Sequence, residues 1–433
     1  MLLVYSHSIS PRLKYIFKQI CTRILNLEVK FTTKVESFIA HDSLKLSYTM
    51  QPLGSEFHIR SHQILFEQGI SDLDISVSSW DETKCFFFNG DKSSMPFDIF
   101  AASFYLLSRY EEYLPHVKDE FGRFSAEDSL AYKHGFLHEP VVDIWAFKFR
   151  DALKQRFPNF SFTERQYRVR PVIDVPMAYY FIQKGVLRTI GGTFNDIINL
   201  KLKRLYQRYM VLMGFKKDPY DTFNWIINKQ KKFNSKFRIF FLIGKYSTYD
   251  KNISINRKKF VSLIKSVADY VTVGLKASYF ALSDFKTLKT EKRSIESVIN
   301  TDLECSRNSF SRLNLPNTYR DLIELEVRED YTMGYVNHAG FRAGTCTPFL
   351  FYDIDYEIQT PLVIYPYHLM DYTLLDYNSL LDKKEALSRL IQKVKAVKGT
   401  FIPVFHNYTF SSEERWKGFR ELFSDILNSE HEN

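Results

Sequence analysis

The hydrophobic and polar positions follow two different patterns along the chain, and the change comes near residue 165. Before that point, short apolar runs are mixed with longer stretches whose apolar residues recur at helical spacing. These stretches predict three helices, over residues 12–27, 97–113 and 139–157. We therefore expect residues 1–165 to form a small N-terminal α/β domain, whose role the pattern leaves undefined.

From residue 167 onward the pattern consists of short β-rich runs, each followed by a polar loop and a helix-like stretch. The predicted strands cover residues 169–175, 237–243, 271–275 and 401–405. Strands that alternate with helices are typical of a parallel (β/α) barrel or of a doubly wound sheet. Both architectures place functional residues at the carboxyl ends of the strands, so residues 166–433 are expected to carry their site there.

Chemically capable side chains stand at three of these strand ends. Asp174 ends the first predicted strand, Lys276 and Tyr279 follow the third, and His406 follows the last. A carboxylate can act there as a general base or a metal ligand, and an imidazole as an acid or base. The alternatives are a helix N-cap for Asp174 and a structural role for His406. We take Asp174 and His406 as catalytic candidates, and Lys276 and Tyr279 as substrate-binding candidates.

Two later segments have an unusual composition for loops. Arg342 lies between Gly340 and Gly344, which allow a ligand to approach the backbone closely, as an anion-binding or sugar-binding loop requires. The segment Tyr365–Asp371 combines aromatic residues with an acid. Arg342 and Asp371 are therefore added to the substrate-binding candidates.

The composition excludes a disordered chain. Of 433 residues, 45% are hydrophobic and 16% aromatic, enough for large cores or for an aromatic groove that suits sugars. The four cysteines lie far apart without a C-x-x-C pair, which indicates neither a zinc knuckle nor a disulfide framework. A reducing compartment is the simpler interpretation. With no signal-peptide pattern and no run of about 20 apolar residues, we expect a cytoplasmic protein without a transmembrane segment.

The net charge of +9 leaves the class of partner open. Most basic residues are scattered, so a nucleic-acid partner is not expected. The densest run is Lys201–Arg204, followed by Arg208 and by Lys216–Lys217, in a helix-like stretch. Either a solvated helix face or contact with a membrane surface would explain this run, and the solvated face is the simpler of the two.

Taken in order, several segments resemble one family. The matching segments are Ser108–Tyr113, Gly122–Phe124, Pro140–Trp145, Asp221–Trp225, Asp330–Tyr335, Gly340–Gly344 and Trp416–Arg420. Over nearly its whole length the chain is similar to the polysaccharide deacetylase-like proteins of Bacteroidetes. The resemblance implies an N-terminal domain joined to a distorted (β/α) barrel of the NodB-homology type, also called carbohydrate esterase family four.

The same resemblance implies a divalent metal, usually zinc, that activates water to hydrolyse an acetyl group on a sugar. In the family an Asp and two His bind the metal, a second Asp takes the proton, and another His protonates the leaving group. This chain departs at three of those positions. Pro176 replaces the second acid of the Asp pair, Lys276 replaces one histidine, and Ser309 replaces the other. We therefore expect no metal cofactor, with the Lys276 ammonium pairing with Asp174 in its place.

Two functions are favoured, and a purely structural or nucleic-acid-binding protein, which only the net charge of +9 supports, ranks last. The first is a degenerate, metal-less deacetylase homologue that binds a glycan or acts in surface polysaccharide synthesis, with a carbohydrate as its partner. The second is a working carbohydrate deacetylase that uses Asp174 and His406 alone, or that recruits other ligands such as His338 or His368. The sequence indicates no oligomeric state.

Overall fold

The computed structural model describes residues 1–431, which divide into two compact units. Unit 1 comprises residues 1–168, 311–369 and 386–402, and unit 2 comprises residues 169–310, 370–385 and 403–431 of the described chain. The first segment of unit 1 ends at residue 168, close to residue 165, where the sequence pattern changes. Unit 1 also includes two later segments that the sequence pattern assigned to the second domain.

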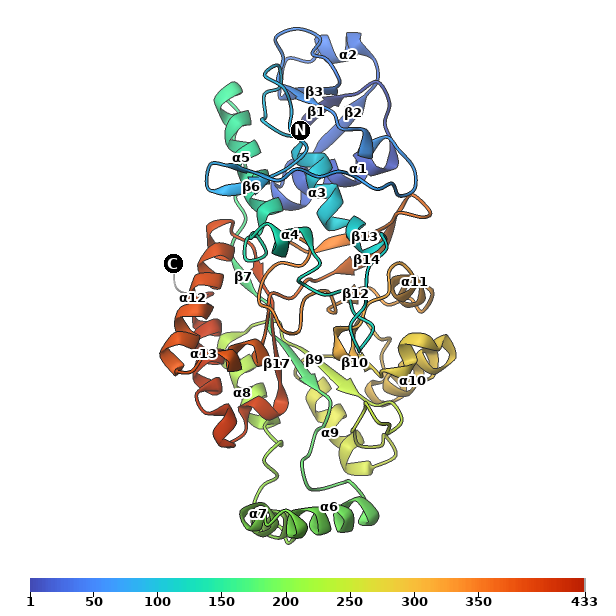
Figure 1. The fold of residues 1–433 in the computed structure, drawn as a ribbon, viewed down its shortest axis with the longest axis vertical. Coiled ribbons are helices and arrows are strands. Elements are labelled where there is room, and N and C mark those ends of the chain that lie inside the picture. The colour runs from blue at the N-terminus through green and yellow to red at the C-terminus, as the bar shows by residue number, and fades with distance from the viewer. Residues whose placement is uncertain (432–433) are drawn as a thin grey trace. The chain divides into compact units, whose positions relative to one another are not determined.

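Unit 1 contains a four-stranded parallel sheet in the order β2-β1-β3-β4 (Figure 1). Its strands are β1 (Leu2–Tyr5), β2 (Val29–Thr32), β3 (Lys45–Thr49) and β4 (His58–Arg60). The helices of this part are α1 (Pro11–Phe17), α2 (Val35–Ile39), α3 (Ile99–Leu107), α4 (Leu130–Lys133) and α5 (Val141–Arg156). The three helices predicted from the sequence are confirmed, but their α-helical parts are shorter than predicted. The first of them continues after α1 as a π-helix, Lys18–Ile24.

The core of unit 1 is built from aromatic side chains. Phe17 stacks on Phe100 with ring centroids 3.6 Å apart, and both rings contact Tyr48 edge to face. Asp98 begins α3, because its carboxylate accepts hydrogen bonds from the amides of Phe100 and Ala101. The same carboxylate accepts from the Tyr48 hydroxyl, and this bond ties the helix start to the sheet.

The later segments of unit 1 add α11 (Asn317–Glu324), β12 (Glu329–Asp330), β13 (Phe349–Asp353) and β14 (Ile358–Ile364). Strand β14 pairs antiparallel with β13 and parallel with β12. The remaining strands of the chain are short: β5 (Ser78–Trp80), β6 (Thr83–Cys85), β7 (Arg168–Val169), β15 (Leu369–Met370) and β16 (Thr400–Phe401). The helix α12 (Leu380–Ala396) is longer.

Unit 2 is built on five parallel strands in the order β11-β10-β9-β8-β17. They are β8 (Val172–Val175), β9 (Arg238–Leu242), β10 (Thr272–Ala277), β11 (Cys305–Asn308) and β17 (Pro403–His406). Four of them confirm the predicted strands. The described residues form no closed barrel, because these strands follow one another in an open order. The expected barrel is thus corrected to an open parallel arrangement in a mixed α/β chain.

Helices connect the strands of unit 2. They are α6 (Val186–Ile198), α7 (Leu202–Leu212), α8 (Phe223–Phe233), α9 (Lys258–Ala268), α10 (Phe285–Ile299) and α13 (Phe419–Asn428). Figure 1 shows α8 and α13 on one side of the strands and α9 and α10 on the other, while α6 and α7 lie together beyond the strand ends. Because all five strands run in the same direction, their carboxyl ends meet at one edge.

Candidate functional site

The carboxyl edge of the unit 2 strands brings four of the candidate residues together. His406 at the end of β17 lies directly beside Asp174 of β8 in the strand register. Lys276 near the end of β10 is two strands away from Asp174, with β9 between them. Asp371 is the first residue of the 3₁₀ helix Asp371–Asp376, and its carboxylate contacts His406. The parallel topology therefore places Asp174, Lys276 and His406 at one edge, and the contact with His406 adds Asp371.

Asp174 is buried and is held by two cationic side chains. The Lys276 ammonium donates a hydrogen bond of 2.6 Å to Asp174 Oδ2. Arg307 Nε lies 3.1 Å from Oδ1 and 3.0 Å from Oδ2 of the same carboxylate. The pairing of Lys276 with Asp174 that the sequence suggested is thus present, and Arg307 is a partner that it missed.

The position of Arg307 follows from the register. It lies on β11 directly beside Lys276 of β10, so both cations project from neighbouring strands toward the same carboxylate. The sequence pattern of this segment indicated only a replaced histidine at Ser309. A usable signal was the arginine itself, since a strand of Cys-Ser-Arg-Asn composition buries a cation that requires an acidic partner.

The cluster changes the acidity of its members. Burial alone would raise the pKa of Asp174, but the charges of Arg307, Lys276 and His406 outweigh it and hold that pKa below its ordinary value. Burial lowers the pKa of Lys276, and the neighbouring Arg307 lowers it further, while Asp174 opposes this shift. The cations thus favour the charged form of Asp174, and Asp174 in turn favours the charged form of Lys276 against burial and Arg307.

His406 lies between two carboxylates. Its Nδ1 lies 3.0 Å from both carboxylate oxygens of Asp371, and its backbone amide donates to Asp371 Oδ2 at 2.7 Å. Its Nε2 points toward Asp174, 3.9 Å from Oδ2. A carboxylate on Nδ1 fixes the orientation of the ring and leaves Nε2 as the nitrogen that can exchange a proton. The imidazole side chain keeps 9% of its surface accessible, against 1% for Asp174.

Aromatic rings follow the strands at the same edge. The His406 ring stacks on Tyr408 at 4.9 Å and meets Tyr372 edge to face at 5.3 Å. The hydroxyls of these two tyrosines are 2.7 Å apart. Beyond β10, Tyr279 stacks on Tyr249 at 4.0 Å, and its backbone amide donates to Asp250. Tyr279 is therefore at the strand ends, where the sequence placed it.

The residues around Asp174 do not fit a divalent metal ion. Among residues 1–431, no group of three or more His, Cys, Asp or Glu side chains could hold one. At the position next to the carboxylate there is an ammonium group, which repels a dication, and Pro176 has no donor side chain. The two alternative ligands lie in unit 1. There His338 pairs with Glu127, and burial lowers the pKa of His368 to about 3.

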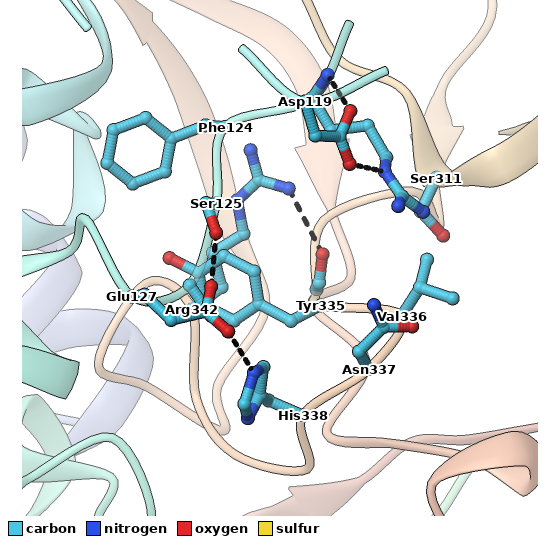
Figure 2. A pocket seen from close by; sticks show the side chains of 13 residues that line it. Asp119, Phe124, Ser125, Glu127, Ser311, Tyr335, Val336, Asn337, His338 and Arg342 are labelled. Atoms are coloured by element: carbon cyan, nitrogen blue, oxygen red, sulfur yellow. Dashed lines mark hydrogen bonds and ion pairs between the residues drawn. The ribbon is translucent and has the colours of Figure 1, made fainter. Parts of the chain in front are cut away.

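Arg342 is the candidate that the structure places elsewhere. It belongs to unit 1, is 2% exposed, and its guanidinium donates to both oxygens of Glu112 and to the Gly334 carbonyl. It lines a polar pocket with about 360 Å³ of empty space, together with Tyr335 and His338 (Figure 2). Arg342 therefore forms a bidentate ion pair with Glu112 inside unit 1, and its contact with a sugar stays a prediction.

Comparisons with known proteins find one family model and several solved structures that are similar to this chain. Residues 2–158 match the model of a family of unknown function, DUF7033. No curated protein matches the chain. The solved structures that are similar to it include a candidate polysaccharide deacetylase of Mycobacterium smegmatis, at 14% identity and a TM-score of 0.39, covering 62% of this chain and 86% of that one.

Two other similar structures come from Bacillus species. A polysaccharide deacetylase of Bacillus cereus matches at 11% identity and a TM-score of 0.30, covering 61% of this chain and 87% of its own. A carbohydrate esterase family four pseudoenzyme of Bacillus anthracis matches at 10% identity and a TM-score of 0.30, covering 61% of this chain and 62% of its own. Because these sequence identities and TM-scores are low, the fold described above rests on the strand order and not on these matches.

Proposed function

We propose that this chain is a polysaccharide deacetylase-like protein that binds a carbohydrate at the carboxyl edge of the unit 2 strands and does not use a metal ion there. The observation that carries the proposal is the contact of 2.6 Å between the Lys276 ammonium and Asp174, with Arg307 on the same carboxylate. Two cations already neutralise the anion, so a dication would gain little attraction from Asp174 and would be repelled by both.

The surroundings of the cluster support a sugar as the ligand. Tyr372 and Tyr408 are half-buried, so part of the surface of each side chain is open. Aromatic rings with a polar hydroxyl suit the mixed apolar and hydroxylated faces of a pyranose. His406 and Tyr279 add hydrogen-bonding groups at the same strand ends.

The test is zinc titration by calorimetry together with elemental analysis of the purified protein. The unmodified chain should bind no stoichiometric zinc, and Pro176→Asp/Lys276→His/Ser309→His should gain it. A matched control is Lys286→His, because Lys286 is an exposed lysine of α10. Tight zinc binding by the unmodified protein would overturn the proposal. Binding to a panel of acetylated and deacetylated oligosaccharides, lost in Tyr372→Ala, would support the carbohydrate part.

A second candidate is a metal-independent hydrolase, which the Asp371–His406 contact favours. An imidazole oriented through Nδ1 by a carboxylate can act as general base and acid through Nε2. Acetate release from acetylated oligosaccharides, measured with metal chelators present, distinguishes this candidate. Release that disappears in His406→Ala but persists in His338→Ala would establish it. If the unmodified protein releases no acetate, carbohydrate binding remains the proposed function.

A further inference from the structure

The two helices α6 and α7 carry an unusual concentration of exposed apolar side chains. Thirteen large apolar residues between Val186 and Phe215 are exposed. They are Val186, Leu187, Ile190, Phe194, Ile197, Ile198, Leu200, Leu202, Tyr206, Tyr209, Leu212, Met213 and Phe215. Leu187 is 86% exposed, Phe194 64% and Ile198 72%. Contiguous exposed apolar surface of this kind marks an interaction site in a folded protein.

These side chains lie on continuous helix faces. In α6, Leu187, Ile190, Phe194 and Ile197 follow one another at intervals of three and four residues, which aligns them along one side of the helix. In α7 and just after it, Leu202, Tyr206, Tyr209 and Met213 repeat the same spacing. Each helix therefore presents an apolar stripe to solvent instead of to a core.

One ion pair of the helix pair is turned inward. Asp196 of α6 is fully buried and accepts from Arg208 of α7 at 2.6 Å, and Arg204 lies 3.4 Å from the same carboxylate. Gly192 allows this approach, because a Cβ atom there would lie 2.8 Å from Arg208 Nη1. The helices α6 and α7 are thus joined by a buried ion pair, and their large apolar side chains face the solvent. In a water-soluble helix pair the apolar side chains would instead lie between the helices.

The charges beside the apolar stripes have one sign. Residues 184–217 contain eight Lys and Arg but a single acid, Asp196, whose charge is used within the helix pair. Lys201, Lys203, Lys216 and Lys217 are exposed at the turn between the helices and just after α7. The basic run that the sequence suggested as a solvated face therefore lies beside apolar residues.

We propose that α6 and α7 form an anchor that lies in the interface of an anionic lipid bilayer, with the apolar stripes among the acyl chains and the lysines at the headgroups. No helix of the described residues is long and apolar enough to cross a membrane, so the helices lie in its plane. A cationic amphipathic surface matches anionic headgroups, whereas a second copy would bring like charges together. The proposal is independent of the ligand at Asp174.

The experiment is co-flotation of the full-length chain with vesicles of phosphatidylcholine alone and of phosphatidylcholine mixed with phosphatidylglycerol. The protein should float with the anionic vesicles, and high salt should weaken the binding. Leu187→Ser/Phe194→Ser/Ile198→Ser should reduce binding by at least about tenfold. The control Ile39→Ser/Val117→Ser/Leu381→Ser removes apolar residues of similar exposure, 66%, 82% and 65%, and should bind as the unmodified protein does.

The charge test uses Lys201→Gln/Lys203→Gln/Lys216→Gln/Lys217→Gln. This variant should lose the preference for anionic vesicles by at least about tenfold. Removing the exposed Lys258, Lys259, Lys286 and Lys289 should not have that effect. Flotation that is equal in the apolar variant and its control would overturn the proposal. So would a protein that ignores anionic vesicles but forms oligomers that the apolar variant dissociates, because a second copy would then cover this face.

Discussion

Glu112 in unit 1 and Asp174 in unit 2 are both carboxylates buried between two cationic side chains, and the two differ in what else touches them. In unit 1, Glu112 accepts from Arg109 Nε at 2.8 Å and from Arg342 at 2.7 and 2.9 Å. Arg109 also donates to Glu111 and to the Arg342 carbonyl. The donors and acceptors of this cluster are internal, and its side chains are 1–9% exposed.

In unit 2, Asp174 is held by Lys276 and Arg307 in a similar way, but a titratable imidazole stands next to it. His406 is as buried as the unit 1 cluster, and it has its own carboxylate, Asp371, on its other nitrogen. The comparison shows that neutralising a buried anion is a common structural device, which does not by itself indicate a functional site. A proton-exchanging group at the edge of the neutralised pair is what distinguishes the unit 2 cluster.

The comparison predicts the largest effect in the closed cluster. Arg342→Ala removes the bidentate partner of Glu112 and leaves a buried charge with one cation, which should cost about 3–5 kcal/mol of unfolding free energy. Urea unfolding followed by circular dichroism measures it. Lys148→Ala, which removes an exposed pair with Asp81, should cost only about 0–1 kcal/mol. Equal losses in both variants would mean that the Glu112 cluster is not a closed structural unit.

The same cluster should make the protein sensitive to acid. Burial alone would raise the pKa of Glu112, but Arg342 and Arg109 lower it to about 2 in the folded state, against about 4.5 when unfolded. The resulting stabilisation is therefore fully present above pH 4.5 and is lost as the pH falls from 4.5 toward 2. It amounts to about 3 kcal/mol. Unfolding free energies measured across this range should fall less steeply in Glu112→Gln, and an unchanged slope would contradict the assignment.

The contrast between these clusters also shows what the sequence could predict. The β-rich runs located four of the five strands of unit 2, and their ends located Asp174, Lys276 and His406, because parallel topology turns strand ends into neighbours. Strand β11 was missed, since Cys-Ser-Arg-Asn lacks apolar periodicity. The ion pair of Arg342 with Glu112 was not predicted, because a glycine-flanked arginine has the same local pattern whether or not it pairs with a residue 230 positions away.

A smaller effect is expected when one cation is removed from the unit 2 cluster. In Lys276→Met, Arg307 still pairs with Asp174 and only one hydrogen bond to the carboxylate is lost. Methionine also fills most of the lysine volume, whereas Arg342→Ala removes two hydrogen bonds and leaves a cavity, so the unfolding free energy should change here by no more than about 1 kcal/mol. Urea unfolding beside Arg342→Ala makes the comparison direct. A loss as large as that of Arg342→Ala would mean that the unit 2 cluster is as closed as that of unit 1.

The smallest expected change is a shift in the pKa of Lys276 itself, with opposite signs in two variants. Asp174 raises the pKa of Lys276 and Arg307 lowers it, against the larger lowering by burial. Asp174→Asn should therefore lower this pKa further, and Arg307→Gln should raise it. Titration of the lysine side-chain NMR signals measures both, with the exposed Lys286 as an internal reference that stays unchanged. Shifts of the same sign in both variants would show that the ammonium responds to a change in burial, and that Asp174 is not the group that keeps it protonated.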